Sequence, residues 1–244
     1  MYQRFQQAQQ QAAKACFCLL IDPDKLTLQQ ADALVERSVE AGVDCFFIGG
    51  SLLVNDQLDA LLSRIRAQCS LPLVLFPGSS RQLSHRADAL LLLSLISGRN
   101  AELLIGKHVE AAPFLRASGL EIMPTGYMLI DGGVATSVSY MSNTVPIPAT
   151  KNDIAACTAM AGELLGLRLI YMDAGSGAQT PVSDAMISAV RQSVNLPLIV
   201  GGGIRSAEVA RQKVEAGASA IVVGNAIEKD PTLIAEIAAA VHGG

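Results

Sequence analysis

The chain has 244 residues, of which 50% are hydrophobic and 16% are charged, and its formal net charge is −4. This size and apolar content predict an α/β protein with an ample core, and because no change of composition marks a boundary, we expect one domain over residues 1–244. The acidic balance, the absence of tryptophan and the lack of a basic run beside aromatic residues argue against nucleic acid as a partner.

The N-terminal segment, residues 1–15, is rich in Gln and is predicted to form a helical extension ahead of the first strand. It does not resemble a secretory signal, because the apolar stretch that follows it runs straight into Asp22. The longest apolar run, residues 87–96, is too short for a membrane span of about 20 residues. We therefore expect a cytoplasmic protein with no integral membrane segment.

The five cysteines are an odd number and lack the spacing of a metal site. Cys16 and Cys18 are two residues apart on a predicted strand and share one of its faces, whereas Cys45, Cys69 and Cys157 are scattered among apolar neighbours. We interpret all five as buried free thiols in a reducing compartment, in preference to disulfides.

Short, continuously apolar runs recur along the chain, and this pattern is typical of parallel strands that are buried on both faces. Eight strands are predicted, over residues 16–21, 44–50, 72–76, 89–96, 120–130, 167–173, 197–202 and 220–225. Amphipathic stretches with helical spacing separate most of them, over residues 28–41, 54–68, 101–117, 151–165, 182–193, 207–216 and 231–241. The first helix has the clearest ends, with Thr27 and Gln30 as a capping box and Gly42 after the last turn.

Strands and helices that alternate until the strand count reaches eight predict a (β/α)8 TIM barrel. A doubly wound open sheet is the alternative, but no G-x-G-x-x-G fingerprint follows the first strand. The third helix is predicted to be short or missing, because only residues 77–88 separate the third and fourth strands. Residues 131–151 are rich in Gly, Ser and Thr without a helical period, and we interpret them as a lid or substrate-binding loop rather than a disordered linker.

Active sites of such barrels lie at the C-terminal ends of the strands, so polar residues that end the apolar runs are the candidates. The strongest pattern is a pair of glycine turns, with Gly202 and Gly203 after the seventh strand and Gly224 and Asn225 after the eighth. Backbone N–H groups in such turns bind phosphate, and glycine lets the anion approach without a Cβ in the way. The alternative is that these glycines only permit tight turns.

Asp22 ends the first strand, and Ser51 follows the second. A carboxylate at the end of a buried strand is costly unless a cation or hydrogen-bond donors surround it. Asp22 is consistent with binding Mg²⁺, capping a turn or pairing with Lys25, and the sequence does not choose among these roles. Ser51 by itself is equally consistent with a helix N-cap.

Asp173 lies in the stretch YMDAGSGA, directly ahead of a Gly-Ser-Gly turn. One interpretation is a turn residue. The other is a substrate contact, and because a carboxylate repels phosphate, we expect Asp173 to accept a proton from the hydroxyl of a phosphorylated alcohol. His85, His108 and His242 show no spacing of a metal site or a catalytic triad and are interpreted as structural or surface residues.

The motifs LIDPDK, FFIGGS, YMDAGSGA, LIVGGGIRS and AIVVGNAIEKD, in this order, resemble those of the geranylgeranylglyceryl phosphate synthase family. The stretches PTGYMLIDGG and PIPATKNDIA are similar to a branch found in some archaea and certain bacteria, and the resemblance extends from about Cys16 to Asp230. It implies a Mg²⁺-dependent prenyltransferase that joins the hydroxyl of sn-glycerol 1-phosphate to a long-chain prenyl (geranylgeranyl) diphosphate, forms an ether-lipid precursor and releases pyrophosphate. It also implies a barrel without a proper third helix, a homo-oligomer, and only transient membrane contact for the lipid product.

The resemblance assigns roles to individual positions. It implies that Asp22 and Ser51 hold Mg²⁺ and that Asp173 is the catalytic residue. The glycerol phosphate would be bound by Tyr171, Met172, Asp173, Ala174, Gly175, Ser176, Gly177, Gly202, Gly203, Gly224 and Asn225. An apolar groove for the prenyl tail is expected along Leu91–Ile96 and the loop around Tyr127–Tyr140, where the third helix is missing.

Two positions depart from the family pattern. Asp173 stands where the commoner motif has a glutamate that is one methylene longer. Another branch has a phosphate-binding lysine two residues before the metal aspartate, where this chain has Leu20, so Lys25 or Arg205 is expected to supply the missing cation.

Two other functional classes compete with the prenyltransferase. A phosphate-binding barrel isomerase acting on a small phosphorylated metabolite would use the same glycine turns, but it needs a matched acid and base and no metal. A non-catalytic barrel that senses a phosphorylated metabolite would gain nothing from the two carboxylates of Asp22 and Asp173. Mg²⁺ dependence and activity with an apolar diphosphate distinguish these classes.

Overall fold

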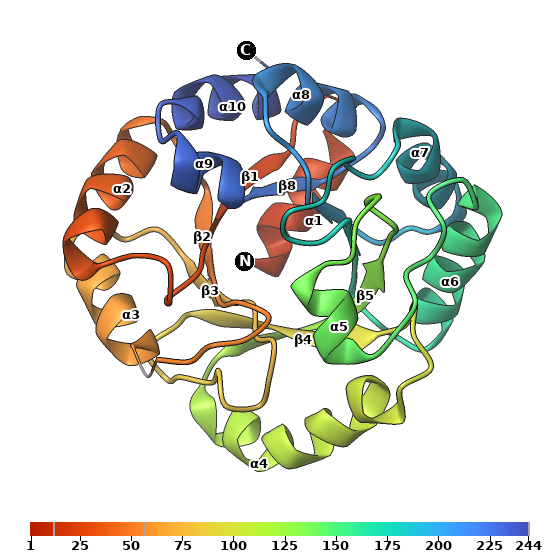
Figure 1. The fold of residues 1–244 in the computed structure, drawn as a ribbon, viewed down its shortest axis with the longest axis horizontal. Coiled ribbons are helices and arrows are strands. Elements are labelled where there is room, and N and C mark those ends of the chain that lie inside the picture. Colours follow the sequence, from red (N-terminus) through yellow and green to blue (C-terminus); the bar gives the residue numbers. More distant parts are fainter. Residues whose placement is uncertain (12, 56, 244) are drawn as a thin grey trace.

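The computed structural model describes residues 1–244 with the exception of residues 12, 56 and 244. Eight parallel strands pair in chain order and form a closed barrel, which β8 completes by pairing with β1 (Figure 1). They are β1 Cys16–Ile21, β2 Cys45–Ile48, β3 Leu73–Leu75, β4 Ala89–Leu95, β5 Glu121–Leu129, β6 Leu169–Asp173, β7 Leu198–Gly201 and β8 Ala220–Val223. The predicted (β/α)8 barrel is therefore confirmed, and the open sheet is wrong.

Helices surround the barrel and bury the outer faces of its strands (Figure 1). The outer ring consists of α2 Leu28–Glu40, α3 Leu58–Arg66, α4 Lys107–Ser118 with the π-helical turn η1 Glu102–Gly106 ahead of it, α6 Asn152–Leu164, α7 Asp184–Ser193, α8 Ala207–Glu215 and α10 Leu233–Val241. One apolar layer fills the space between strands and helices and a second fills the barrel itself, which explains why each strand is apolar on both faces.

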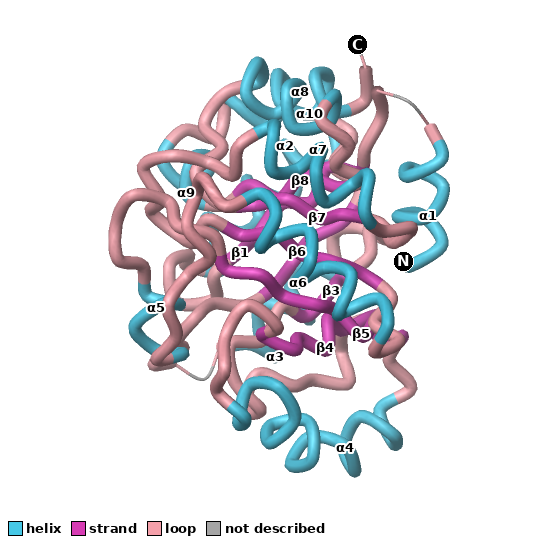
Figure 2. The backbone as a smooth tube through the Cα atoms, turned by 90° about the vertical axis from the view of Figure 1, so that its right-hand side faces the viewer, coloured by secondary structure: helices cyan, strands magenta, loops and turns pink. Residues whose placement is uncertain are grey.

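The two ends of the barrel are closed differently. Helix α1 Tyr2–Gln10 covers the end where the strands begin, and the short helices α5 Ser137–Ser142 and α9 Asn225–Lys229 lie at the opposite end (Figure 2). Phe5 of α1 is fully buried and packs edge-on against Phe47 of the inner layer, with ring centroids 6.4 Å apart. The barrel is thus sealed at one end, and a ligand must enter at the other.

The connection between β3 and β4 has no helix in the part of the chain that the structure describes, which confirms the missing third helix. Residues 76–88 form turns instead. These turns take the place of the outer helix that the other strand connections contain. Within the described residues, no helix is both long and apolar enough to cross a membrane.

Local predictions were confirmed where a side chain marks a helix end. Thr27 and Gln30 form both hydrogen bonds of the capping box at the start of α2, and Gly42 has the left-handed φ of +79° after its last turn. The predicted start of the second helix at Val54 is wrong, since α3 begins at Leu58. The backbone N–H groups of Val54 and Asn55 donate instead to the Asp24 carboxylate, which holds this segment in a loop.

Two further predictions need correction. The segment 131–151 does contain a helix, α5, because Thr136 and Ser139 form a capping box in a stretch too short to show a helical period. All five cysteines are free as predicted, but only Cys16, Cys18 and Cys45 are buried, whereas Cys69 is half-buried and Cys157 is exposed.

Replacing Phe5 tests whether α1 belongs to the core. The Phe5→Ala variant should lose about 3–5 kcal/mol of unfolding free energy, because a fully buried ring leaves a cavity against Phe47. Urea denaturation followed by circular dichroism measures this loss, and Phe5→Leu, which refills most of the volume, should lose less than half as much. A loss below about 1 kcal/mol in the alanine variant would show that α1 contributes little to the core.

Candidate functional site

A cavity of about 1250 Å³ opens at the end of the barrel where the strands finish. Polar residues from the loops after β1, β2, β6, β7 and β8 line one part of it, and apolar residues of β4 and α4 line another. The predicted site residues on its wall are Asp22, Ser51, Tyr171, Asp173, Gly175, Ser176, Gly177, Gly202, Gly203, Gly224 and Asn225. Met172 and Ala174 are not on this wall, because their side chains pack in the outer apolar layer.

Asp173 ends β6 and is 7% exposed. Its Oδ2 accepts a hydrogen bond from the Tyr127 hydroxyl at 2.5 Å, and its Oδ1 accepts one from the Gly175 N–H at 2.7 Å. Burial raises the pKa of Asp173 above its ordinary value, and the two hydrogen bonds partly oppose this. Each carboxylate oxygen accepts about two hydrogen bonds, so acceptor capacity remains for a ligand in the cavity.

The residues around Asp173 hold it in one place. Burial, followed by the nearby Asp173 carboxylate, raises the pKa of Tyr127 well above its ordinary value, so the phenol remains a proton donor. Phe76 stacks on Tyr171 at 5.1 Å, and Tyr127 meets Tyr171 edge-on at 5.4 Å. A Cβ on Gly202 would lie 2.7 Å from Asp173 Oδ1 and 2.6 Å from the Gly175 nitrogen, so only glycine fits there. No local pattern in the sequence indicated that Tyr127 contacts Asp173, because the two residues are 46 positions apart.

The glycine turns expose backbone donors to the cavity. The N–H groups of Ser176, Gly177, Gly203 and Asn225 have no protein acceptor among the described residues. Asn225 is the first residue of α9, so its N–H points out of the helix start. Such groups are suited to an anion, and they lie beside Asp173 on the same cavity wall.

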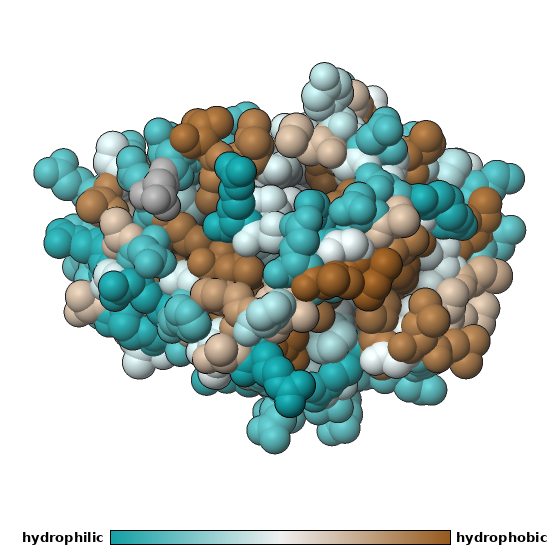
Figure 3. Space-filling view, turned by 90° about the horizontal axis from the view of Figure 1, so that it is seen from below, coloured by the Kyte–Doolittle hydropathy of each residue, from teal (hydrophilic) through white to brown (hydrophobic). Residues whose placement is uncertain are grey.

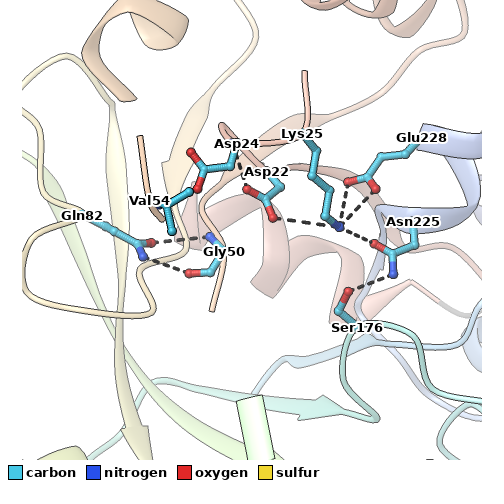
Figure 4. A network of polar contacts seen from close by, with 9 residues as sticks. All are labelled: Asp22, Asp24, Lys25, Gly50, Val54, Gln82, Ser176, Asn225 and Glu228. Atoms are coloured by element: carbon cyan, nitrogen blue, oxygen red, sulfur yellow. Dashed lines mark hydrogen bonds and ion pairs between the residues drawn. The ribbon is translucent and has the colours of Figure 1, made fainter. Parts of the chain in front are cut away.

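A chain of polar contacts crosses the cavity mouth from β1 to β6 (Figure 4). Lys25 Nζ donates to Asn225 Oδ1 at 2.9 Å and lies 3.2 Å from the Glu228 carboxylate. Asn225 Nδ2 in turn donates to the Ser176 hydroxyl at 2.8 Å. Arg205, the other predicted cation, donates to the carbonyl of Ala178 at 2.5 Å. Both cations therefore lie at the cavity, and Lys25 contacts the glycine-turn region through a side chain.

The Asp22 carboxylate lines the same cavity as Asp173 but follows β1, which is three strands from β6 around the closed barrel. Its Oδ1 accepts the Asp24 N–H at 3.1 Å, and its Oδ2 is 3.9 Å from Lys25 Nζ, which is too far for a hydrogen bond. Burial raises the pKa of Asp22, with the Asp24 N–H and then Lys25 partly opposing. The carboxylate is thus partly desolvated and incompletely satisfied.

These residues fit a magnesium ion. Over the described parts of the chain, no three His, Cys, Asp or Glu side chains gather as a metal cage. Mg²⁺ does not need one, since it keeps several waters and binds through one or two carboxylates together with substrate phosphates. Asp22 offers such a carboxylate, and Ser51 lies on the same wall, adjacent in sequence to Gly50, whose Cβ position is 2.9 Å from Asp22 Oδ2.

The apolar part of the cavity extends along β4 where the third helix is missing. Its walls are Leu90–Leu93, Leu95, Leu103, Ala111 and Leu115, joined by Val138 and Met141 of α5. Figure 3 looks onto the side that carries α4 and shows apolar surface across the middle of this face, bordered by polar side chains. The predicted groove along Leu91–Ile96 therefore coincides with a cavity except at Ser94 and Ile96, which are not on its wall.

The histidines stay apart from the polar part of the site. His242 pairs with Asp44, and His85 packs against Phe114. His108 lines the apolar part of the cavity and contacts the carbonyl oxygen of Leu93 at 2.8 Å.

The fold and the cavity together define a (β/α)8 barrel whose active-site end combines backbone donors suited to an anion with an adjoining apolar groove. Comparison with known proteins is more specific: the chain belongs to the PcrB family, whose model matches residues 9–241. It is 56% identical over 226 residues to the geranylgeranylglyceryl phosphate synthase of Chitinophaga pinensis, which covers 93% of this chain and 90% of that protein.

More distant relatives agree with this assignment. The chain is 38% identical to the geranylgeranylglyceryl phosphate synthase of Korarchaeum cryptofilum, over 93% of each protein. It also matches the crystal structure of (S)-3-O-geranylgeranylglyceryl phosphate synthase from Thermoplasma acidophilum in complex with its substrate sn-glycerol-1-phosphate. That match has a TM-score of 0.94 at 30% identity and covers 100% of this chain and 99% of the other.

The raised pKa of Asp173 predicts a pH-dependent stability effect. A carboxyl whose pKa is higher in the folded chain than in the unfolded chain stabilises the fold below its unfolded pKa, and this contribution is lost as the pH rises through its folded pKa. Asp173→Asn removes the cost of the buried charge, and its amide can still accept from Gly175 and donate to the Tyr127 oxygen. We expect its melting temperature to exceed that of the parent by about 2 °C or more at pH ~7.

The same comparison at pH ~4 is the control. Because the pKa of Asp173 is raised in the folded state, acid protonates this carboxyl more in the folded than in the unfolded chain, so the difference in melting temperature should shrink. Thermal unfolding by circular dichroism measures both values. An advantage of the asparagine variant that grows toward acid would contradict the raised pKa.

Proposed function

We propose that this protein is a Mg²⁺-dependent prenyltransferase that joins the hydroxyl of sn-glycerol 1-phosphate to a long-chain prenyl diphosphate, forming an ether-lipid precursor and releasing pyrophosphate. The observation that carries the proposal is that Asp173 shares one cavity with a set of backbone N–H groups suited to phosphate and with a long apolar groove. The names of its relatives support the same reaction. An isomerase of small metabolites would leave the groove along β4 without a use.

The glycine turns would bind the glycerol phosphate. The N–H groups of Ser176, Gly177, Gly203 and Asn225 would hold the phosphate, and Asn225 is itself held by Ser176 and Lys25. Lys25, rather than Arg205, is the cation we assign to this site, because Lys25 binds the side chain of Asn225, whose own N–H is one of these donors, whereas Arg205 donates to the Ala178 carbonyl. Fixing the phosphate in this way would place the hydroxyl end of the substrate toward Asp173.

Asp173 would orient that hydroxyl and accept its proton. The raised pKa makes the carboxylate a stronger base than an exposed aspartate, while Tyr127 and Gly175 prevent it from rotating. The oxygen would then form a bond to the allylic carbon of the prenyl group as the bond from that carbon to the diphosphate breaks. Burial of Asp173 and the aromatic rings of Phe76, Tyr127 and Tyr171 exclude water, which would otherwise compete for the same carbon.

The apolar groove along β4 would hold the prenyl tail, with the diphosphate at its polar end near Asp22. Asp22 and Ser51 would hold Mg²⁺, which when bound supplies positive charge that stabilises the leaving diphosphate. Because Asp22 follows β1 and Asp173 ends β6, three strands apart around the barrel, the two carboxylates would act on different parts of the reacting pair.

We also propose that the protein forms a homo-oligomer. Leu164 and Leu165, at the end of α6, are 89% and 78% exposed, and Ile154 of the same helix is also exposed. Apolar side chains gathered on one helix in this way support a subunit interface. The cytoplasmic location and the transient membrane contact remain predictions.

The assay that tests the reaction uses radiolabelled sn-glycerol 1-phosphate with prenyl diphosphates of several lengths. Label should enter an organic-soluble product with a long prenyl donor, EDTA should abolish this, and added Mg²⁺ should restore it. The enantiomer sn-glycerol 3-phosphate is the matched control substrate. Incorporation that is unaffected by EDTA would contradict the role of the metal, and no incorporation with any donor would contradict the reaction.

Asp173→Asn tests the proton acceptor. The amide cannot accept the proton, so kcat/KM should fall by at least about 100-fold, while the dissociation constant for glycerol phosphate should change little. Steady-state kinetics and calorimetric titration measure the two quantities. Turnover within about tenfold of the parent would show that Asp173 is not the base.

A further inference from the structure

We infer that Gln82 is a positioning residue of the cation site, because it fixes the loop that carries Ser51 against Asp22. This inference rests on the proposed function, in which Asp22 and Ser51 hold Mg²⁺. Gln82 lies in the turns that replace the third helix, and its side chain is directed at the loop after β2 (Figure 4).

The side chain of Gln82 is a buried polar group with every bond directed at backbone. The residue is 4% exposed. Its Nε2 donates to the Gly50 carbonyl at 2.9 Å, while its Oε1 accepts from the Gly78 N–H at 3.0 Å and from the Gly50 N–H at 3.4 Å. One amide thus joins the loop after β2 to the loop after β3.

The two loops and Asp22 are in close contact at this point. A Cβ on Gly78 would lie 2.4 Å from the Gly50 carbonyl oxygen and 2.9 Å from that of Ser51. A Cβ on Gly50 would lie 2.9 Å from Asp22 Oδ2. The backbone beside Asp22 is therefore closely packed. A small shift of Gly50 would also move its neighbour Ser51 relative to the Asp22 carboxylate.

Asp24 holds the far end of the same loop. Its carboxylate accepts the N–H groups of Val54 at 2.6 Å and Asn55 at 3.1 Å, and its own N–H donates to Asp22 Oδ1. Along the chain, Ser51 therefore lies between two fixed points: Gly50, which Gln82 binds, and Val54, which Asp24 binds. Both points are labelled in Figure 4. Ligands of a Mg²⁺ site must be placed accurately, because the ion demands near-octahedral geometry.

Gln82→Met tests this role, since methionine has a similar length and removes all three hydrogen bonds. We expect Mn²⁺ binding in the presence of pyrophosphate, measured from the electron paramagnetic resonance signal of free Mn²⁺, to weaken about tenfold or more. The Mg²⁺ concentration for half-maximal turnover should rise by a similar factor, high Mg²⁺ should recover most of kcat, and KM for glycerol phosphate should change less than about twofold. If Gln82→Met had simply lost its structure, high Mg²⁺ would not restore its kcat.

Gln68→Met is the matched control, because Gln68 is an exposed glutamine that also loses side-chain bonds, to Asp32 and to the Arg64 carbonyl, but does not touch the cavity. It should leave Mn²⁺ affinity unchanged. If Gln82→Met does not fold, Gln82→Glu keeps both accepted N–H bonds and loses only the donor to Gly50. Its deuterium uptake over residues 49–55 should rise at least about twofold at early times, with no change over residues 16–21.

The possible failures are distinguishable. Parent-like Mn²⁺ affinity in Gln82→Met, or parent-like deuterium uptake in Gln82→Glu, would overturn the positioning role and leave the proposed reaction intact. A parent protein that transfers prenyl groups without binding Mn²⁺ would overturn both the cation site and the role of Gln82 in it. A parent protein that binds Mn²⁺ but transfers no prenyl group would overturn the proposed reaction. The positioning role would then still be supported if Gln82→Met binds Mn²⁺ more weakly than the parent.

Discussion

A carboxylate kept out of water is the constraint on which the rest of the site depends. Asp173 is buried at the end of β6, and this desolvation raises its pKa. A buried carboxylate charge is costly unless hydrogen-bond donors surround it. Tyr127 and the Gly175 N–H supply one donor to each oxygen, and Gly202 leaves the space that a side chain would take from them. The same environment makes the group basic, oriented and shielded from competing water.

The barrel explains how carboxylates, backbone donors suited to an anion and an apolar groove come together in one cavity. Parallel strands finish at the same end, so segments far apart in sequence bring Asp22 and Asp173 to one cavity, three strands apart around the barrel. The backbone donors of the glycine turns lie beside one carboxylate. The missing third helix has two consequences, because it opens an apolar groove along β4 and leaves turns that deliver Gln82 to the loop beside Asp22.

The sequence predicted the features that are written in local patterns. Apolar runs located all eight strands, and the Thr27–Gln30 capping box located the start of α2. Contacts between distant segments left no such pattern. The start of α3 was misplaced because Asp24 binds the backbone at Val54, and the bond from Tyr127 to Asp173 joins residues 46 apart. Polar side chains that bond to backbone resemble ordinary loop residues until the fold is known.

The most direct test is a crystal structure of the protein with glycerol phosphate, Mn²⁺ and a thio analogue of the prenyl diphosphate, which cannot react. The account predicts anomalous density for Mn²⁺ at Asp22, the phosphate at the N–H groups of the glycine turns, and a substrate hydroxyl within about 3 Å of an Asp173 oxygen. Mn²⁺ bound at Asp173, or a glycerol hydroxyl directed away from that carboxylate, would contradict it.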